Sequence, residues 1–384
     1  MAVTIEQSPS TDFVLSGNPI IWVFSSNQTG QDNFSYYVEV YVDGVLNSSH
    51  QVFPESGIYG KFDASQIAES VSGIPSTPTT LIGEESTDWV FTYIKVYERY
   101  GTTPSLQASA TSSTELIIKG KLFKNTWINS DLNNYFIDSS SEKLLLTDNN
   151  EFTLHENELL NIYFCVDAGS FDDYYIFLKY YNESGTLLNT SSQILTKYRK
   201  NCLSVSWNIL DGLYSLNDVG YVVMYLEDDS NVKSTIDYTI NIDKCFRPDT
   251  TRLHFLNQLG GVDAFTFDAV SKQSMSTQTN SFLTTQGGFD GAAYTYSTTN
   301  SQTGNYQVTS NTKLMLESNW INEDIMQWLN DNLFTSPYIL METANGLQRV
   351  ANTSASVKYK KNRNDTAFNV VIELDLQMHS SMII

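Results

Sequence analysis

Charged side chains are scarce in this 384-residue chain: Asp, Glu, Lys and Arg make up 17% of it, against roughly 25% in typical soluble proteins. The few charges are mostly acidic, with 22 Lys and Arg against 43 Asp and Glu, so the formal net charge is −21. A surface of that sign repels phosphate groups. We therefore expect no direct binding to nucleic acid.

Long apolar runs are also missing. No run approaches the roughly 18–20 residues that a membrane-spanning helix needs, so we expect no membrane contact. The first residues contain neither a basic region nor an apolar stretch, and no secretory signal is visible there.

Residue types that bind metals or act as nucleophiles are few. None of the four histidines pairs with another at metal-ligand spacing, and no zinc-protease, nucleophile-elbow or phosphate-loop motif is present. The three cysteines, Cys165, Cys202 and Cys245, lie far apart, and we expect buried free thiols rather than a disulfide. We expect no enzyme, no cofactor and no metal site. Acidic clusters at probable hairpin ends, residues 172–173 and 227–229, leave calcium binding open.

The abundant residues favour β-structure, because aromatics reach 13%, with 23 Tyr and 20 Phe. Residues 20–24 form an apolar run, and residues 34–42 and 45–52 flank Asp43-Gly44, which predicts a hairpin. A short helix is expected at residues 64–71, capped by Asp63. Residues 1–125 are interpreted as an immunoglobulin-like β-sandwich.

A polar segment at residues 125–150 marks the predicted first boundary, and a second β-sandwich is expected over residues 146–247. Adjacent tyrosines at 36–37, 174–175 and 180–181 lie in expected strands. Neighbours in a strand point to opposite faces, so one tyrosine of each pair should be buried and the other should face outward. Outward tyrosines suit either protein interfaces or carbohydrate binding.

The last third, residues 248–384, is expected to be a small α+β assembly module. Apolar residues recur every four positions from Ile321 to Leu333, which predicts a helix over residues 323–334 with Asn322 as cap. Residues 271–312 are dominated by Ser, Thr, Gln, Asn and Gly, which indicates either extended β-structure or an exposed arm. With few large aliphatics, the arm is expected to order on contact with an adjacent subunit.

Two stretches of this last third resemble a known group. Residues 252–267, RLHFLNQLGGVDAFTF, resemble a segment of virion tail proteins of crAss-like and related tailed phages of Bacteroides-type hosts. A second stretch is similar to the assembly module of these proteins. It contains Trp320, Trp328, Tyr338 and a basic tip with Lys360 and Lys361.

The first stretch also has a local physical logic. Gly260-Gly261 permits a sharp reversal that places Phe255 against the same core as residues 265 and 267. Asn257 and Asp263 are expected to hydrogen-bond the backbone of that turn.

The resemblance implies a structural virion protein whose α+β assembly module forms a homo-oligomeric ring in the tail or neck. With the two immunoglobulin-like β-sandwiches expected from the strand pattern, the chain is predicted to be mainly β. The resemblance also implies synthesis in the host cytoplasm, and other tail, neck or portal-proximal virion proteins as partners. The alternatives are a carbohydrate-binding adhesin and a head-fibre or decoration protein. A polysaccharide-degrading enzyme is less favoured, because repeated short β-helical coils are absent. The assembly candidates are Phe255, Asn257, Gly260, Gly261, Asp263, Trp320, Trp328, Tyr338, Lys360 and Lys361.

Overall fold

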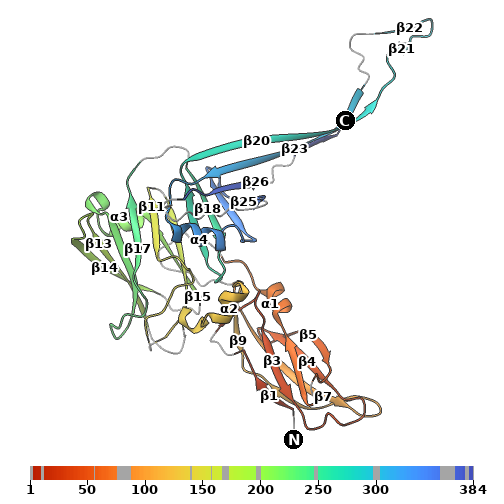
Figure 1. The fold of residues 1–384 in the computed structure, drawn as a ribbon, viewed down its shortest axis with the longest axis vertical. Coiled ribbons are helices and arrows are strands. Elements are labelled where there is room, and N and C mark those ends of the chain that lie inside the picture. The colour runs from red at the N-terminus through yellow and green to blue at the C-terminus, as the bar shows by residue number, and fades with distance from the viewer. Residues whose placement is uncertain are drawn as a thin grey trace. The chain divides into compact units, whose positions relative to one another are not determined.

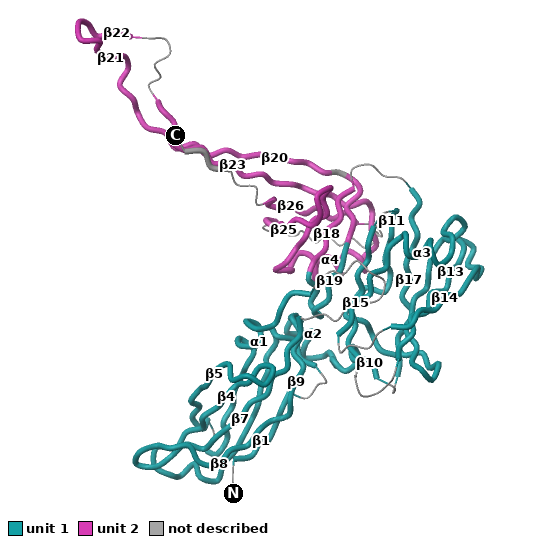
Figure 2. The backbone as a smooth tube through the Cα atoms, turned by 180° about the vertical axis from the view of Figure 1, so that it is seen from behind, with its two compact units in different colours: residues 1–246, 256–264 teal, residues 247–255, 265–384 magenta. Residues whose placement is uncertain are grey.

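The computed structural model is mainly β, with several sheets and short helices (Figure 1). It divides into unit 1, residues 1–246 and 256–264, and unit 2, residues 247–255 and 265–384 (Figure 2). The mainly β prediction is confirmed. The structure describes all residues except 1–2, 10–12, 56, 76–87, 139–140, 157, 167–172, 196–199, 246–249, 297–302, 355–367, 377–379 and 384.

The first half of unit 1 is built from two sheets around one core, which includes Trp22, Phe24 and Tyr36, all fully buried. The smaller sheet has the order β1-β3-β6 and the larger β2-β9-β7-β4-β5, with β8 paired to β7. The elements are β1 (Thr4–Gln7), β2 (Phe13–Leu15), β3 (Ile21–Ser25), β4 (Ser35–Val42), β5 (Val45–Val52), β6 (Tyr59–Asp63), α1 (Ser65–Val71), β7 (Val90–Tyr100), β8 (Ser105–Thr111) and β9 (Glu115–Ile118).

The predicted β4–β5 hairpin is confirmed. The two strands pair antiparallel from Tyr36↔Val52 to Val42↔Val45. Asp43 and Gly44 both have positive φ, 48° and 79°, which is the backbone geometry that a two-residue hairpin turn needs.

The second half of unit 1 repeats the two-sheet plan, with a β10-β12-β15 sheet and a β11-β17-β16-β13-β14 sheet enclosing a second core. Tyr174 and Tyr180 are buried in it, whereas Tyr175 and Tyr181 are half-buried on the other face, as expected from strand alternation. The elements are β10 (Phe136–Ile137), β11 (Glu151–His155), β12 (Leu159–Val166), β13 (Tyr174–Tyr181), β14 (Leu187–Leu195), β15 (Lys200–Ser206), α3 (Trp207–Leu213), η2 (Leu216–Asp218), β16 (Tyr221–Asp228) and β17 (Tyr238–Asp243).

The segment 125–150, expected to mark a boundary, is not an exposed linker. It contains α2 (Lys124–Asn129), which begins one residue earlier, η1 (Leu132–Tyr135) and β10. Leu132, Phe136 and Leu146 from this segment are buried in a cluster with residues from both halves of unit 1. Residues 1–125 and 146–247 belong to the same compact unit. The predicted boundaries of three domains therefore stay a prediction.

Unit 2 has one large sheet, ordered β19-β18-β24-β25-β26-β23-β20, with β27 paired to β23. Helix α4 shares its core, in which Leu329 and Leu333 are fully buried. The predicted helix is confirmed, and Asn322 caps it by accepting a hydrogen bond from Ile325 N at 2.8 Å. The elements are β18 (Thr251–Leu256), β19 (Val262–Phe267), β20 (Val270–Leu283), β21 (Gly288–Phe289), β22 (Tyr294–Thr295), β23 (Thr303–Glu317), α4 (Glu323–Asn332), β24 (Ile339–Thr343), β25 (Gly346–Asn352), β26 (Val371–Asp375) and β27 (Ser380–Ile383).

Two local expectations are wrong. The N-cap of α1 is Ala64 rather than Asp63, because Asp63 is still the last residue of β6. Its carboxylate instead accepts hydrogen bonds from Ser65 N and Ile20 N. All three cysteines are free as expected, but Cys245 is exposed, since it lies beyond the end of β17.

The environments of the cysteines predict distinct thiol reactivity. Burial raises the pKa of Cys165 and of Cys202 to about 12, so neither forms appreciable thiolate at about pH 8. A disulfide-exchange reagent should therefore titrate one thiol rapidly in the folded protein, and Cys245→Ser should abolish that reaction. Denaturant should release the other two. Rapid reaction of all three thiols without denaturant would contradict the burial of Cys165 and Cys202.

Candidate assembly site

The β18–β19 hairpin turns through a tight, glycine-dependent loop. Gly260 has φ +87°, and Asn257 Oδ1 accepts hydrogen bonds from Leu259 N at 3.0 Å and Gly261 N at 2.8 Å. The backbone closes the loop with Asn257 N donating to Gly261 O at 2.9 Å. The predicted role of Asn257 in this turn is therefore confirmed.

The tip of this hairpin, Leu256–Ala264, belongs to unit 1. Asn257 Nδ2 donates to Leu146 O at 2.8 Å, and Leu259 and Val262 are buried in the cluster that joins the two halves of that unit. Asp263 is also buried, and its carboxylate accepts a hydrogen bond from Thr147 Oγ1 at 3.2 Å. Asn257 thus binds the segment around residue 146 as well as shaping the turn, and Asp263 contacts the same segment through Thr147. A hydrogen bond from Asp263 to the backbone of the turn stays a prediction.

A buried cation contacts the same tip. Lys200, at the start of β15, donates from Nζ to Gly260 O at 2.8 Å and forms an ion pair with Asp88. The ammonium also lies 5.5 Å from the centre of the Tyr163 ring. Sequence reasoning did not find this pair, since Lys200 and Asp88 are 112 residues apart and stand in no motif.

The flanking strands of the hairpin contribute to the core of unit 2. Phe255 packs against Trp328 of α4 with ring centroids 5.4 Å apart, and Phe265 contacts Phe267 at 5.1 Å. The prediction that these phenylalanines share one core is confirmed. Trp328 is buried with them, so this part of the sequence pattern stabilises the subunit's own interior.

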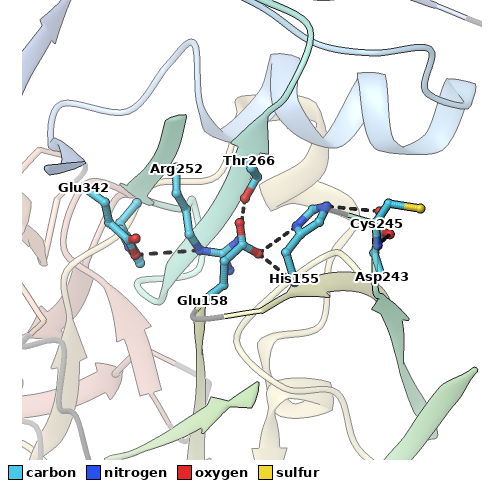
Figure 3. Close-up of polar contacts among 8 residues, drawn as sticks. His155, Glu158, Asp243, Cys245, Arg252, Thr266 and Glu342 are labelled. Atoms are coloured by element: carbon cyan, nitrogen blue, oxygen red, sulfur yellow. Dashed lines mark hydrogen bonds and ion pairs between the residues drawn. The ribbon is translucent and has the colours of Figure 1, made fainter. Parts of the chain in front are cut away.

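Polar side chains also surround the base of β18 (Figure 3). Within unit 2, Arg252 donates to Thr266 Oγ1 at 2.7 Å, and His254 Nε2 lies 2.6 Å from Glu342 Oε1. Arg252 and His254 are almost fully buried. Because an unpaired buried cation is costly, Glu342, whose Oε1 lies 3.9 Å from Arg252 Nε, offsets the charge of Arg252 within this unit.

A separate histidine group lies within unit 1 (Figure 3). His155 Nδ1 is 3.0 Å from Glu158 Oε2, and its Nε2 is 3.2 Å from Asp243 Oδ2. The parallel pairing of β11 with β17 places His155 directly opposite Asp243. Asp243 also accepts a hydrogen bond from Cys245 N at 2.8 Å. In the part of the chain that the structure describes, no group of three or more His, Cys, Asp or Glu is arranged to hold a metal ion.

The most exposed apolar region of unit 2 is the β20–β23 ribbon, in which β23 also pairs with β26 and β27 over part of its length. Strands β20 and β23 pair antiparallel from Val270↔Glu317 to Leu283↔Thr303 and extend from the sheet as a long arm (Figures 1 and 2). Side chains from Ser271 to Leu283 are exposed on both faces, apart from the half-buried Asn280. The described residues of the segment 271–312 thus combine extended β-structure with an exposed surface, which is greatest on β20. Its exposed large apolar residues are Met275, Phe282, Leu283, Phe289, Tyr294, Tyr296 and Tyr306.

The arm is electrically neutral in an acidic protein. Between residues 270 and 317 the charged side chains are Lys272, Lys313, Asp290 and Glu317, which sum to zero, whereas the whole chain carries −21. Two such acidic chains repel each other over most of their surface. The arm is a region where that repulsion is absent and apolar side chains are available.

The remaining sequence-predicted candidates divide by exposure. Trp320 exposes 72% of its side chain, and Tyr338 is half-buried beneath the Arg349 guanidinium, 5.0 Å from its ring centre. Lys360 and Lys361 lie outside the described residues. The five residues of the hairpin are buried or enclosed within the chain, so Trp320 is the described candidate most available to a second molecule.

The comparisons with known proteins identify no family. No protein-family model matches the chain, and the search of curated proteins gives no match. A solved structure described as the calcium binding domain CBD12 of CALX1.1 matches 63% of this chain and 100% of its own, with 10% identity and a TM-score of 0.21. A marsupial T cell receptor structure matches 81% of this chain and 96% of its own, with 10% identity and a TM-score of 0.23. Among the described residues, no helix has the length and apolar content needed to cross a membrane.

The turn geometry predicts a large effect of Gly260→Ala. A Cβ there would lie 2.2 Å from Lys119 O, and alanine disfavours φ +87°. We expect unit 1 to lose about 2–4 kcal/mol of unfolding free energy, measured by chemical denaturation. The matched control is Gly212→Ala in α3, where the added methyl meets nothing within 4 Å. The control should be neutral or stabilising by up to about 1 kcal/mol, and equal effects of the two changes would contradict the assigned turn.

Proposed function

We propose that this protein is a non-enzymatic structural subunit of a tailed-phage virion, which self-associates into a homo-oligomeric ring in the tail or neck. In this proposal the two halves of unit 1 are immunoglobulin-like β-sandwiches, and unit 2 is the α+β assembly module. Other tail, neck or portal-proximal proteins are its virion neighbours. The −21 charge supports a subunit that avoids direct contact with the DNA passing nearby.

The observation that carries the proposal is the neutral β20–β23 ribbon. Where Ser281–Leu283 of β20 pair with Thr303–Asn305 of β23, the described residues of the ribbon form two strands only. A two-stranded ribbon is marginal by itself, and side chains such as Leu283 (87% exposed) and Tyr296 (75% exposed) gain little from the folded monomer. Burial against a second copy would remove this apolar surface from water at about 25 cal/mol per Å². The expectation that the arm orders fully on contact with an adjacent subunit stays a prediction.

Trp320 gives the proposal a second contact point. It lies between β23 and α4, on the same unit as the ribbon, and exposes most of its indole. Tryptophan is enriched among residues that dominate binding energy at protein interfaces. Deleting α4 itself would be uninformative, because Leu329 and Leu333 are core residues of the subunit.

Substitutions in the β20–β23 ribbon should dissociate the proposed ring without unfolding the subunit. The purified full-length chain should have a mass that is a multiple of 43.3 kDa by mass photometry and form closed rings in negative-stain images. Replacing Phe282 and Leu283 together by serine should shift the population to the monomer, because both side chains are exposed and support no core.

The matched control is Leu106→Ser on β8 of unit 1, another exposed leucine, which should leave the assembly unchanged. A wild-type protein that stays monomeric at all concentrations would contradict the ring. If the Phe282 and Leu283 variant assembles like the wild type, the arm does not form the contact between subunits.

A carbohydrate-binding adhesin is the second candidate, because stacked tyrosine pairs line outward faces of both halves of unit 1. The Tyr41 and Tyr93 rings are 4.8 Å apart, and those of Tyr181 and Tyr221 are 5.0 Å apart. These rings are half-buried and offer polar hydroxyls beside apolar faces, as sugar-binding surfaces do. A monomeric wild-type protein that retains glycans on an array would favour this candidate.

A further inference from the structure

The buried Lys200–Asp88 pair of unit 1 has no place in the proposed assembly surface. The Lys200 side chain is 0% exposed and that of Asp88 is 1% exposed, and Nζ and Oδ2 are in direct contact. Lys200 begins β15, whereas Asp88 precedes β7, so the contact joins the two halves of unit 1. A nucleophilic amine and a carboxyl group are therefore held together away from water.

The surroundings of the pair provide partners for Lys200 Nζ but leave one oxygen of Asp88 without a partner among the described residues. Besides Asp88, Lys200 Nζ donates to Gly260 O and faces the ring of Tyr163. Among the described residues, Asp88 Oδ1 has no hydrogen-bond partner. Cys165, opposite Lys200 in the β12–β15 pairing, is fully buried, so the walls of this site exclude water.

The direct contact between Nζ and Oδ2 gives a proton a path from one group to the other. An ion pair removed from water is costly unless every donor and acceptor is satisfied, and burial disfavours the charged form of an amine and of a carboxyl alike. Transfer of one proton from Nζ to the carboxylate yields a neutral amine beside a carboxylic acid. These are the reactive forms of the two groups.

We propose that Lys200 and Asp88 condense to an intramolecular amide. After the proton transfer, the lone pair of Nζ attacks Asp88 Cγ, the C–N bond forms and one Cγ–O bond breaks. The departing hydroxyl takes a proton from the nitrogen and leaves as water, so no oxidant, reductant or activating group is required. The Gly260 carbonyl holds one N–H of the amine and keeps Nζ against the carboxyl group.

The cross-link has a structural consequence that is independent of ring formation. It replaces two buried charges by one neutral amide and closes a covalent loop across the 112 positions between the two residues. A closed loop restricts the unfolded chain, as a disulfide does. Unit 1 thereby gains resistance to unfolding without any cysteine pair.

The test is the intact mass of the folded, purified full-length protein under denaturing conditions. The expected mass is one water molecule below that of the processed chain, and protease digestion should yield a branched peptide joining the Asp88 and Lys200 segments. Lys200→Arg removes the nucleophile and should restore the full mass and lower the melting temperature. The matched control is Lys143→Arg, because the Lys143–Asp138 pair, at 3.3 Å, is partly exposed on the aspartate side. That variant should keep both the mass deficit and the branched peptide.

The wild-type measurement decides the proposal whether or not the Lys200 variant folds. A full mass for the folded wild-type protein, with separate peptides for the two segments, would overturn the amide and leave an ion pair. A mass deficit that maps to a different pair of residues would also overturn it.

Discussion

The fully buried end of the Lys200 side chain is the constraint around which unit 1 is organised. Its Nζ must have oxygen partners because a polar group left unpaired in the interior is destabilising, and it finds them in Asp88 and the Gly260 carbonyl. Those partners come from the first half of the unit and from a hairpin that follows the second half. The contact therefore holds three distant parts of the chain in one arrangement.

The apolar cluster around this contact explains why unit 1 is a single compact body. Phe13 and Ile118 from the first half, Tyr163 from the second and Leu259 from the hairpin tip are buried together. Because these residues share one core, removing the hairpin tip would expose apolar surface in both halves. The same hairpin continues into strands whose phenylalanines stabilise unit 2, so a short sequence serves two cores.

Local patterns predicted the local structure well. Alternation identified β4, Asp43-Gly44 identified the hairpin turn to β5 with positive φ at both residues, and Asn322 identified the start of α4. These signals depend on neighbours within about ten residues, where propensity and periodicity are informative.

Features set by distant contacts were not predictable in this way. The segment 125–150 is polar on average, yet Leu132, Phe136 and Leu146 are buried by strands far away in sequence. The partnership of Lys200 with Asp88 has no local signature. In the candidate assembly site, the sequence pattern of the hairpin predicted a well-packed structural element. Which apolar residues of the arm are exposed depends on how β20 and β23 pair, and the sequence pattern did not predict that pairing.

The hairpin tip is an integral part of unit 1, and hydrogen exchange at its amides tests this most directly. The amides of Leu259 and Gly261 donate to the buried Asn257 side chain. They should exchange only when unit 1 unfolds, as slowly as the amides of β12 and β15. Exchange as fast as at the exposed Asp43-Gly44 turn would contradict the account.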